Sequence, residues 1–140
     1  MGTSEYDSSN LCCLPENSAI GQCLKTLKVL EKSSELKCIK VVTNEDYYDG
    51  YSESTIYLKS TNWNIEISYD NHCTADLSFI ISLKILKIGE NKYLDTMRYL
   101  SSDLLEDYLH TIKSKLGYEQ LTSALQIIAK AVIEIVRKNI

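Results

Sequence analysis

The hydrophobic positions of this chain follow two different periods, and the period changes twice. Between residues 18 and 34 apolar side chains recur at helical spacing, which predicts an amphipathic helix that begins at Asn17 or Ser18. From about residue 38 to residue 99 apolar and polar residues alternate, which predicts strands. Helical spacing returns near residue 102 and continues to about residue 138.

The alternating segment predicts five strands joined by short turns. We expect them at 38–42, 55–59, 64–69, 77–85 and 92–99. The clearest alternation places one set of apolar side chains on a single face: Leu77, Phe79, Ile81, Leu83 and Ile85. Successive strands with short connections imply an antiparallel meander with one solvated face.

The C-terminal third predicts two helices, at 102–116 and 118–138, separated by Gly117. The last helix carries a long apolar stripe: Leu121, Leu125, Ile128, Val132 and Ile135. We therefore expect an α+β fold with an N-terminal helix, an antiparallel meander of about five strands and two C-terminal helices on one face. Residues 1–16 are polar and are expected to be a flexible arm, with 17–140 forming a single domain.

Length and composition narrow the class of protein. A chain of 140 residues suits one hydrophobic core. No apolar run is long enough to cross a membrane, and no secretory signal is evident, so we expect an intracellular protein, cytoplasmic or nuclear. The net charge of −4 and the scattered lysines argue against nucleic-acid binding. An odd number of cysteines, five, favours free thiols over a disulfide framework.

The chain offers little sign of catalysis. It contains no phosphate-binding loop, zinc-protease motif or nucleophile elbow. His72 and Cys73 are adjacent, but neighbours in a strand point to opposite faces, so they do not form a nucleophile and base. The acidic loop that starts at Glu45 has a glycine where a calcium loop needs one, yet Ile56 stands where the closing carboxylate belongs. We therefore expect no enzyme activity, no cofactor and no metal.

One loop stands out as a candidate binding edge. It contains Tyr47, Tyr48 and Tyr51, with Asp46 and Asp49 between and beside them. Tyrosine provides a large contact area at low entropic cost, and acidic neighbours would attract a basic partner. The alternative is that the tyrosines fold back on the sheet as a lid.

Residues 38–139 resemble a known family. The acidic loop NEDYYDGYSES, the strand DLSFIISLKI and a tail with Leu105 and Leu109 before a long final helix carry the resemblance. Together they resemble the RWD-like domains at the globular ends of kinetochore coiled-coil proteins, and within that group the monopolin chromosome-segregation subunits. The resemblance implies kinetochore or chromosome-associated protein partners.

These observations favour a non-enzymatic protein–protein interaction module. A homodimer formed through the helix at 18–34 is one arrangement that its spacing allows, because that spacing also fits a short coiled coil. A second hypothesis is a small-ligand or lipid carrier with an apolar pocket between the sheet and the last helix. A third is a viral or parasite protein that binds a host factor.

Overall fold

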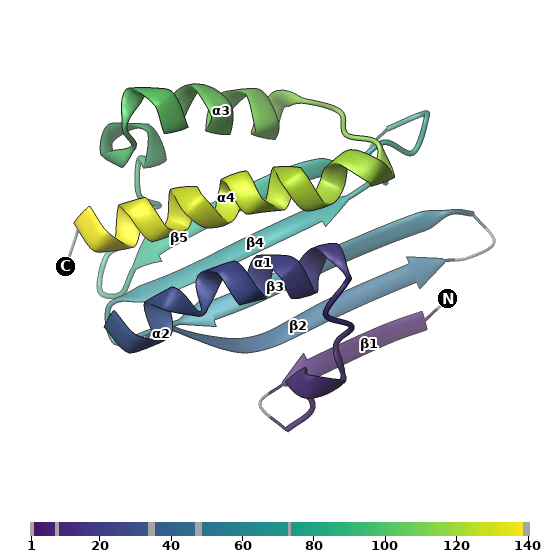
Figure 1. The fold of residues 1–140 in the computed structure, drawn as a ribbon, viewed down its shortest axis with the longest axis horizontal. Helices are drawn as coiled ribbons and strands as arrows, with labels where there is room; N and C mark the ends of the chain where they lie inside the picture. Colours follow the sequence, from purple (N-terminus) through teal and green to yellow (C-terminus); the bar gives the residue numbers. More distant parts are fainter. Residues whose placement is uncertain (1, 8, 34–35, 47–48, 73, 139–140) are drawn as a thin grey trace.

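The computed structural model describes residues 2–7, 9–33, 36–46, 49–72 and 74–138. It has two layers, a five-stranded antiparallel sheet and a layer of helices that lies against one face of that sheet (Figure 1). The predicted α+β class is confirmed, including the two C-terminal helices. The strands are β1 (Gly2–Asp7), β2 (Lys37–Asp46), β3 (Tyr51–Lys59), β4 (Trp63–Asp70) and β5 (Ile80–Lys87), in that order across the sheet.

The helical layer contains α1 (Ala19–Leu27), α2 (Val29–Ser33), α3 (Ser102–Lys113) and α4 (Tyr118–Lys138), with 3-10 turns η1 (Leu11–Cys13) and η2 (Thr96–Tyr99). Ser18 is the N-cap of α1, because its hydroxyl accepts a hydrogen bond from the Gly21 amide at 3.0 Å. The last predicted helix, 118–138, matches α4 at both ends. Its apolar stripe is buried along its whole length.

The core lies between the sheet and α1 and α4 (Figure 1). Directly opposed residues share a face of the sheet, and Val41, Ile56 and Ile67 form a row on the inner face, where all three are fully buried. α1 packs beside α4, with Cys23 on its buried side and Thr26 bonded to Gln126. The apolar stripe of the first helix is therefore used inside the chain, and a homodimer through α1 would need its outward face.

The N-terminal residues differ from the prediction. A flexible arm was predicted for residues 1–16, but residues 2–7 form β1, which pairs with β2 along its whole length. Tyr6 stands opposite Val41 on the inner face, and it is half-buried against the core. One inward aromatic residue in a polar segment gives almost no alternating pattern. The strand forms because the edge of β2 offers unpaired backbone groups.

The predicted strand at 92–99 is wrong. Thr96–Tyr99 form the 3-10 turn η2 there, with Asp95 at its N-cap, and the backbone of Tyr93 and Leu94 meets the edge of β5. The Leu94 amide donates to the Ile85 carbonyl at 2.7 Å, and Tyr93 forms a single bridge with Leu86. The fifth strand of the sheet is therefore β1 and not a C-terminal strand.

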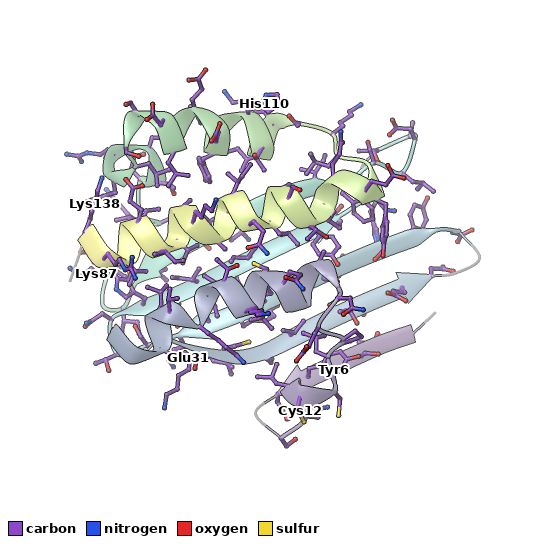
Figure 2. All side chains as sticks on the ribbon, in the orientation of Figure 1. Tyr6, Cys12, Glu31, Lys87, His110 and Lys138 are labelled. Carbon is purple, nitrogen blue, oxygen red and sulfur yellow. The ribbon has the colours of Figure 1, made fainter. Side chains whose placement is uncertain are left out.

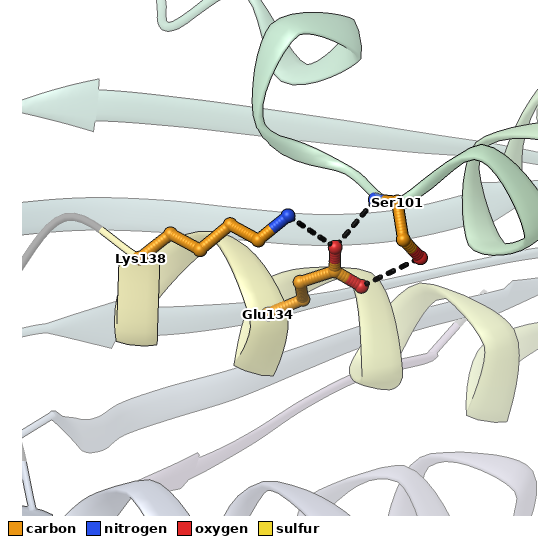
Figure 3. Close-up of polar contacts among 3 residues, drawn as sticks. All are labelled: Ser101, Glu134 and Lys138. Atoms are coloured by element: carbon orange, nitrogen blue, oxygen red, sulfur yellow. Dashed lines mark hydrogen bonds and ion pairs between the residues drawn. The ribbon is translucent and has the colours of Figure 1, made fainter.

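Glu134 on α4 is hydrogen-bonded to Ser101, the residue that precedes α3 (Figure 3). Its carboxylate accepts hydrogen bonds from the Ser101 backbone amide, from the Ser101 hydroxyl at 3.3 Å and from the Lys138 ammonium at 2.7 Å. Burial alone would raise the pKa of Glu134, but these donors outweigh it and hold the pKa below its usual 4.5. The ionised carboxylate therefore stabilises the contact between the two helices.

We expect Glu134→Gln to lower the melting temperature by about 2–4 °C at pH 7. A carboxyl whose pKa is lower in the folded state stabilises the protein above its unfolded pKa, and this contribution is lost as the pH falls. The difference between variant and wild type should therefore shrink as the pH drops from 5 to 3 in thermal melts. Glu106→Gln, at an exposed site on α3, is the control. A difference that stays constant across this range would contradict the role assigned to Glu134.

Candidate functional site

The outer face of the sheet is not covered by the helices. The helices lie on the opposite face (Figure 1). Because side chains alternate along a strand, the residues between the buried positions point outward. One such row crosses the sheet through Lys40, Tyr57, Glu66 and Lys84, which the register places side by side. The two ends of this face differ in charge.

The acidic end lies at the β2–β3 hairpin and is defined by Asp46, Asp49, Glu53 and Asp70. Asp46 stands opposite Tyr51, and Glu53 stands directly opposite Asp70. Like charges directly opposed on neighbouring strands destabilise a sheet. Asn44 partly offsets this cost, because its amide donates to Glu53 at 2.9 Å. The hairpin end therefore keeps two carboxylates directly opposed on its outer face.

Asn71 fixes the geometry of this end, although it follows β4 in the sequence. Its side chain is 3% exposed. Its amide oxygen accepts a hydrogen bond from the Ser52 backbone at 2.8 Å, and its amide nitrogen donates to the Gly50 carbonyl at 2.9 Å. The Asn71 backbone amide also donates to the Ser52 carbonyl at 3.2 Å. The segment after β4 is thereby fastened to the tip of the hairpin.

The bracing brings two ring side chains together at the acidic end. Tyr51 is 38% exposed, and its ring lies 4.9 Å from that of His72. Gly50 supplies the turn before Tyr51 with φ of +74°, a conformation that side chains other than glycine rarely adopt. Leu77 lies over the same turn, since a Cβ placed on Gly50 would come within 2.9 Å of it. The hairpin end is therefore packed by the β4–β5 connection.

The structure describes three of the five residues that the sequence predicted for partner binding. Tyr47 and Tyr48 lie outside the described residues. Tyr51 is the first residue of β3 and not part of a loop, and Asp46 is the last residue of β2. Asp49 is exposed in the turn between them, where its amide donates to the Asp46 carboxylate at 3.4 Å. The structure thus brings Asp46, Asp49 and Tyr51 to one end of the sheet.

The opposite end of the outer face is basic. We define the basic end by Lys37, Lys40, Lys59 and Lys84, and Lys37 stands directly opposite Lys59. A hollow of about 280 Å³ lies there, lined by Ile39, Tyr57, Glu66, Lys84, Leu86 and Tyr93 among others. Sequence reasoning missed this end. The available signal was Tyr57 and Leu86, large side chains at positions where the alternation calls for small or polar ones.

A second hollow, of about 390 Å³, lies between α1 and the segment that follows β1. Its apolar lining includes Leu11, Leu14 and Leu24. Figure 2 marks two other lining residues, Cys12 on η1 and Glu31 on α2. The carrier hypothesis placed a pocket between the sheet and the last helix, so this hollow lies elsewhere.

Two of the described cysteines, Cys23 and Cys38, are poorly suited to nucleophilic chemistry. Burial raises the pKa of Cys23 to about 12, and the nearby Cys38 adds to the effect. Burial raises the pKa of Cys38 to about 11, with a further contribution from Glu31. A thiol must ionise to attack, and these two stay protonated near neutral pH. Cys73 lies outside the described residues, and His110 is exposed on α3.

Among the described residues, no group of three or more cysteine, histidine or acidic side chains is arranged to hold a metal ion. None of the described helices combines the length and apolar character needed to span a bilayer. Comparison of the chain with protein-family models, curated proteins and solved structures finds no match. A functional conclusion therefore depends on the surfaces described above.

Proposed function

We propose that this chain is a non-enzymatic protein-interaction module that binds a basic segment of a partner protein at the acidic end of its sheet. The observation that carries the proposal is the like-charged, uncovered hairpin end, where Glu53 faces Asp70 beside the exposed ring of Tyr51. A basic partner would relieve the repulsion between these carboxylates and gain an aromatic contact.

The chemistry of the described residues supports binding over catalysis. Cys23 and Cys38 remain protonated thiols near neutral pH, which makes them poor nucleophiles. The acidic end also faces solvent, and the Asn71 side chain holds the backbone of its hairpin in place. A preformed surface of this kind binds without a large ordering cost.

The partner's identity is part of the proposal. The resemblance of residues 38–139 to RWD-like kinetochore domains directs the first search toward chromosome-segregation proteins. A viral or parasite protein that captures a host factor would use the same acidic surface, and it differs only in the source of the partner. Affinity capture from the source cell, followed by mass spectrometry, distinguishes these two origins.

Replacing Tyr47, Tyr48 and Tyr51 together with serine tests the proposal. We expect the melting temperature to stay within about 2 °C of the wild type, because Tyr51 is partly exposed and side chains on the surface contribute little to stability. Capture of the main partner should be lost. Tyr118→Ser is the control, since Tyr118 is 80% exposed on the helical side.

Two results would overturn this assignment. If the triple variant melts several degrees lower and loses binding only in proportion to unfolding, the tyrosines are a lid on the sheet. If it folds normally and still captures every wild-type partner, the acidic end is not the binding surface.

A further inference from the structure

The basic end of the outer face carries a second like-charged arrangement. Lys37 stands directly opposite Lys59, and Lys40 and Lys84 lie in the adjoining row. Two acidic residues lie among them, Glu66 on β4 and Asp7, which stands opposite Lys40 on β1, so the four lysines outnumber the acids at this end. Exchanging one lysine of the Lys37–Lys59 pair for an acid would turn repulsion into attraction. The direct opposition of Lys37 and Lys59 therefore costs some stability in the isolated domain, and an acidic ligand would offset that cost.

Large apolar side chains lie among these lysines. Ile39 is the extra residue of a β-bulge in β2, and it is 45% exposed. Tyr93 is 64% exposed, and its bridge with Leu86 holds it beside β5. β-bulges commonly redirect a side chain at a functional surface. Exposed apolar groups from two distant segments of the sequence thus meet at one hollow.

The hollow is preformed. The Lys40 ammonium lies 4.9 Å from the centre of the Tyr57 ring, an attractive cation–π contact that orients both side chains. The Leu94 amide, bonded to Ile85 at 2.7 Å, fixes the segment that carries Tyr93. A volume of about 280 Å³ is at the lower limit for small-molecule pockets and suits one or two inserted side chains.

We propose that the basic end is a docking surface for an acidic segment of a partner protein that inserts a large apolar side chain into this hollow. Charge complementarity identifies the segment as acidic, and the apolar lining from Ile39, Leu86 and Tyr93 identifies the inserted side chain as aromatic or aliphatic. The proposal goes beyond the binding of a basic segment at the acidic end, since it concerns a different surface and a ligand of opposite charge.

The acidic end explains why the ligand is a short protein segment and not a larger polyanion. A nucleic acid or an anionic membrane would extend along the same face toward Glu53, Asp70 and Asp46. Those carboxylates would repel it, and the lysines at the basic end are too few to give a strong counterion release. A segment a few residues long contacts the lysines and avoids the carboxylates.

Selection from a random peptide library tests the proposal with the full chain. Peptides of about twelve residues are long enough to cross four strands spaced about 4.8 Å apart. We expect enriched peptides to carry several Asp or Glu residues around at least one Phe, Tyr, Trp or Leu. A fluorescently labelled member of this set is then the probe for all affinity measurements.

Two variants locate the binding. Lys59→Glu with Lys84→Glu reverses charge at the basic end, and Ile39→Ser with Tyr93→Ser removes the exposed apolar groups. Each should weaken peptide binding by roughly tenfold or more, and added salt should weaken binding to the wild type. The matched controls are Lys25→Glu with Lys28→Glu on the helical side and Tyr118→Ser, which should leave the affinity within about twofold.

The triple tyrosine-to-serine variant separates the two proposals, because it should bind the acidic peptide as the wild type does. Several outcomes would overturn the docking surface: no enriched peptide, an enriched set without acidic residues, or unchanged binding by both site variants. Phosphatidylserine vesicles or single-stranded RNA could also displace the labelled peptide. If either does so at a concentration below the dissociation constant of the peptide, the ligand of the basic end is a polyanion and not a protein segment. A dimer in sedimentation that Lys84→Glu dissociates would assign the face to a second copy of the chain.

Discussion

Ile128→Ala should lower the free energy of unfolding by about 2–5 kcal/mol, a large part of the roughly 5–15 kcal/mol expected of a domain this size. Ile128 is fully buried near the middle of α4, where the helix packs against the inner face of the sheet beside α1. Removing three methyl or methylene groups there loses apolar burial, and the cavity left behind cannot collapse because neighbours on both sides are fixed. Urea unfolding followed by circular dichroism measures the loss.

Lys130→Ala is the matched control, because Lys130 is exposed on the same helix two residues away. It should change the free energy of unfolding by less than about 0.5 kcal/mol. A chain that ends at Gly117 lacks α4 and leaves the inner face of the sheet without its main cover, so it should be insoluble or lack cooperative unfolding. A soluble 1–117 fragment with a cooperative transition would contradict the central place given to α4.

The helical part of the fold was predictable because its pattern is long and locally determined. The stripe from Leu121 to Ile135 spans four turns, and no strand pattern competes with it. β4 and β5 were recognisable as strands for a related reason, since the two faces of each strand meet different environments, although β5 begins at Ile80 and not at the predicted Leu77. β1 was not recognisable as a strand, because its pairing with β2 connects residues about 40 positions apart. The local sequence of residues 2–7 does not indicate which distant segment they pair with.

The candidate sites depend even more on register. Tyr47, Tyr48, Tyr51 and their acids were noticeable as neighbours in sequence. The pairing of Glu53 with Asp70, and of Lys37 with Lys59, requires knowing which residue stands opposite which. Ile39 lies at the basic end because of a β-bulge, and the alternation of apolar and polar residues does not predict where a bulge occurs. Charge separation across the sheet is therefore invisible in the overall charge of −4.

The second large effect is expected at Asn71. Asn71→Ala should lower the free energy of unfolding by about 1–3 kcal/mol, because it leaves the Ser52 amide and the Gly50 carbonyl without their side-chain partner. Both groups belong to the hairpin that forms the acidic end. Hydrogen exchange should therefore show faster exchange at Ser52 in the variant, while amides of α4 exchange as in the wild type until global unfolding dominates.

The same variant connects stability to binding. If Asn71 positions the acidic end, binding of a basic partner should weaken at temperatures where the variant is still fully folded, because Tyr51 and its neighbours lose their fixed arrangement. Binding of an acidic peptide at the basic end should stay unchanged. Asn62→Ala, in the exposed β3–β4 turn, is the control for replacing an asparagine in a turn. Equal loss at both ends of the sheet would show that Asn71 supports the fold as a whole and does not specifically position the hairpin.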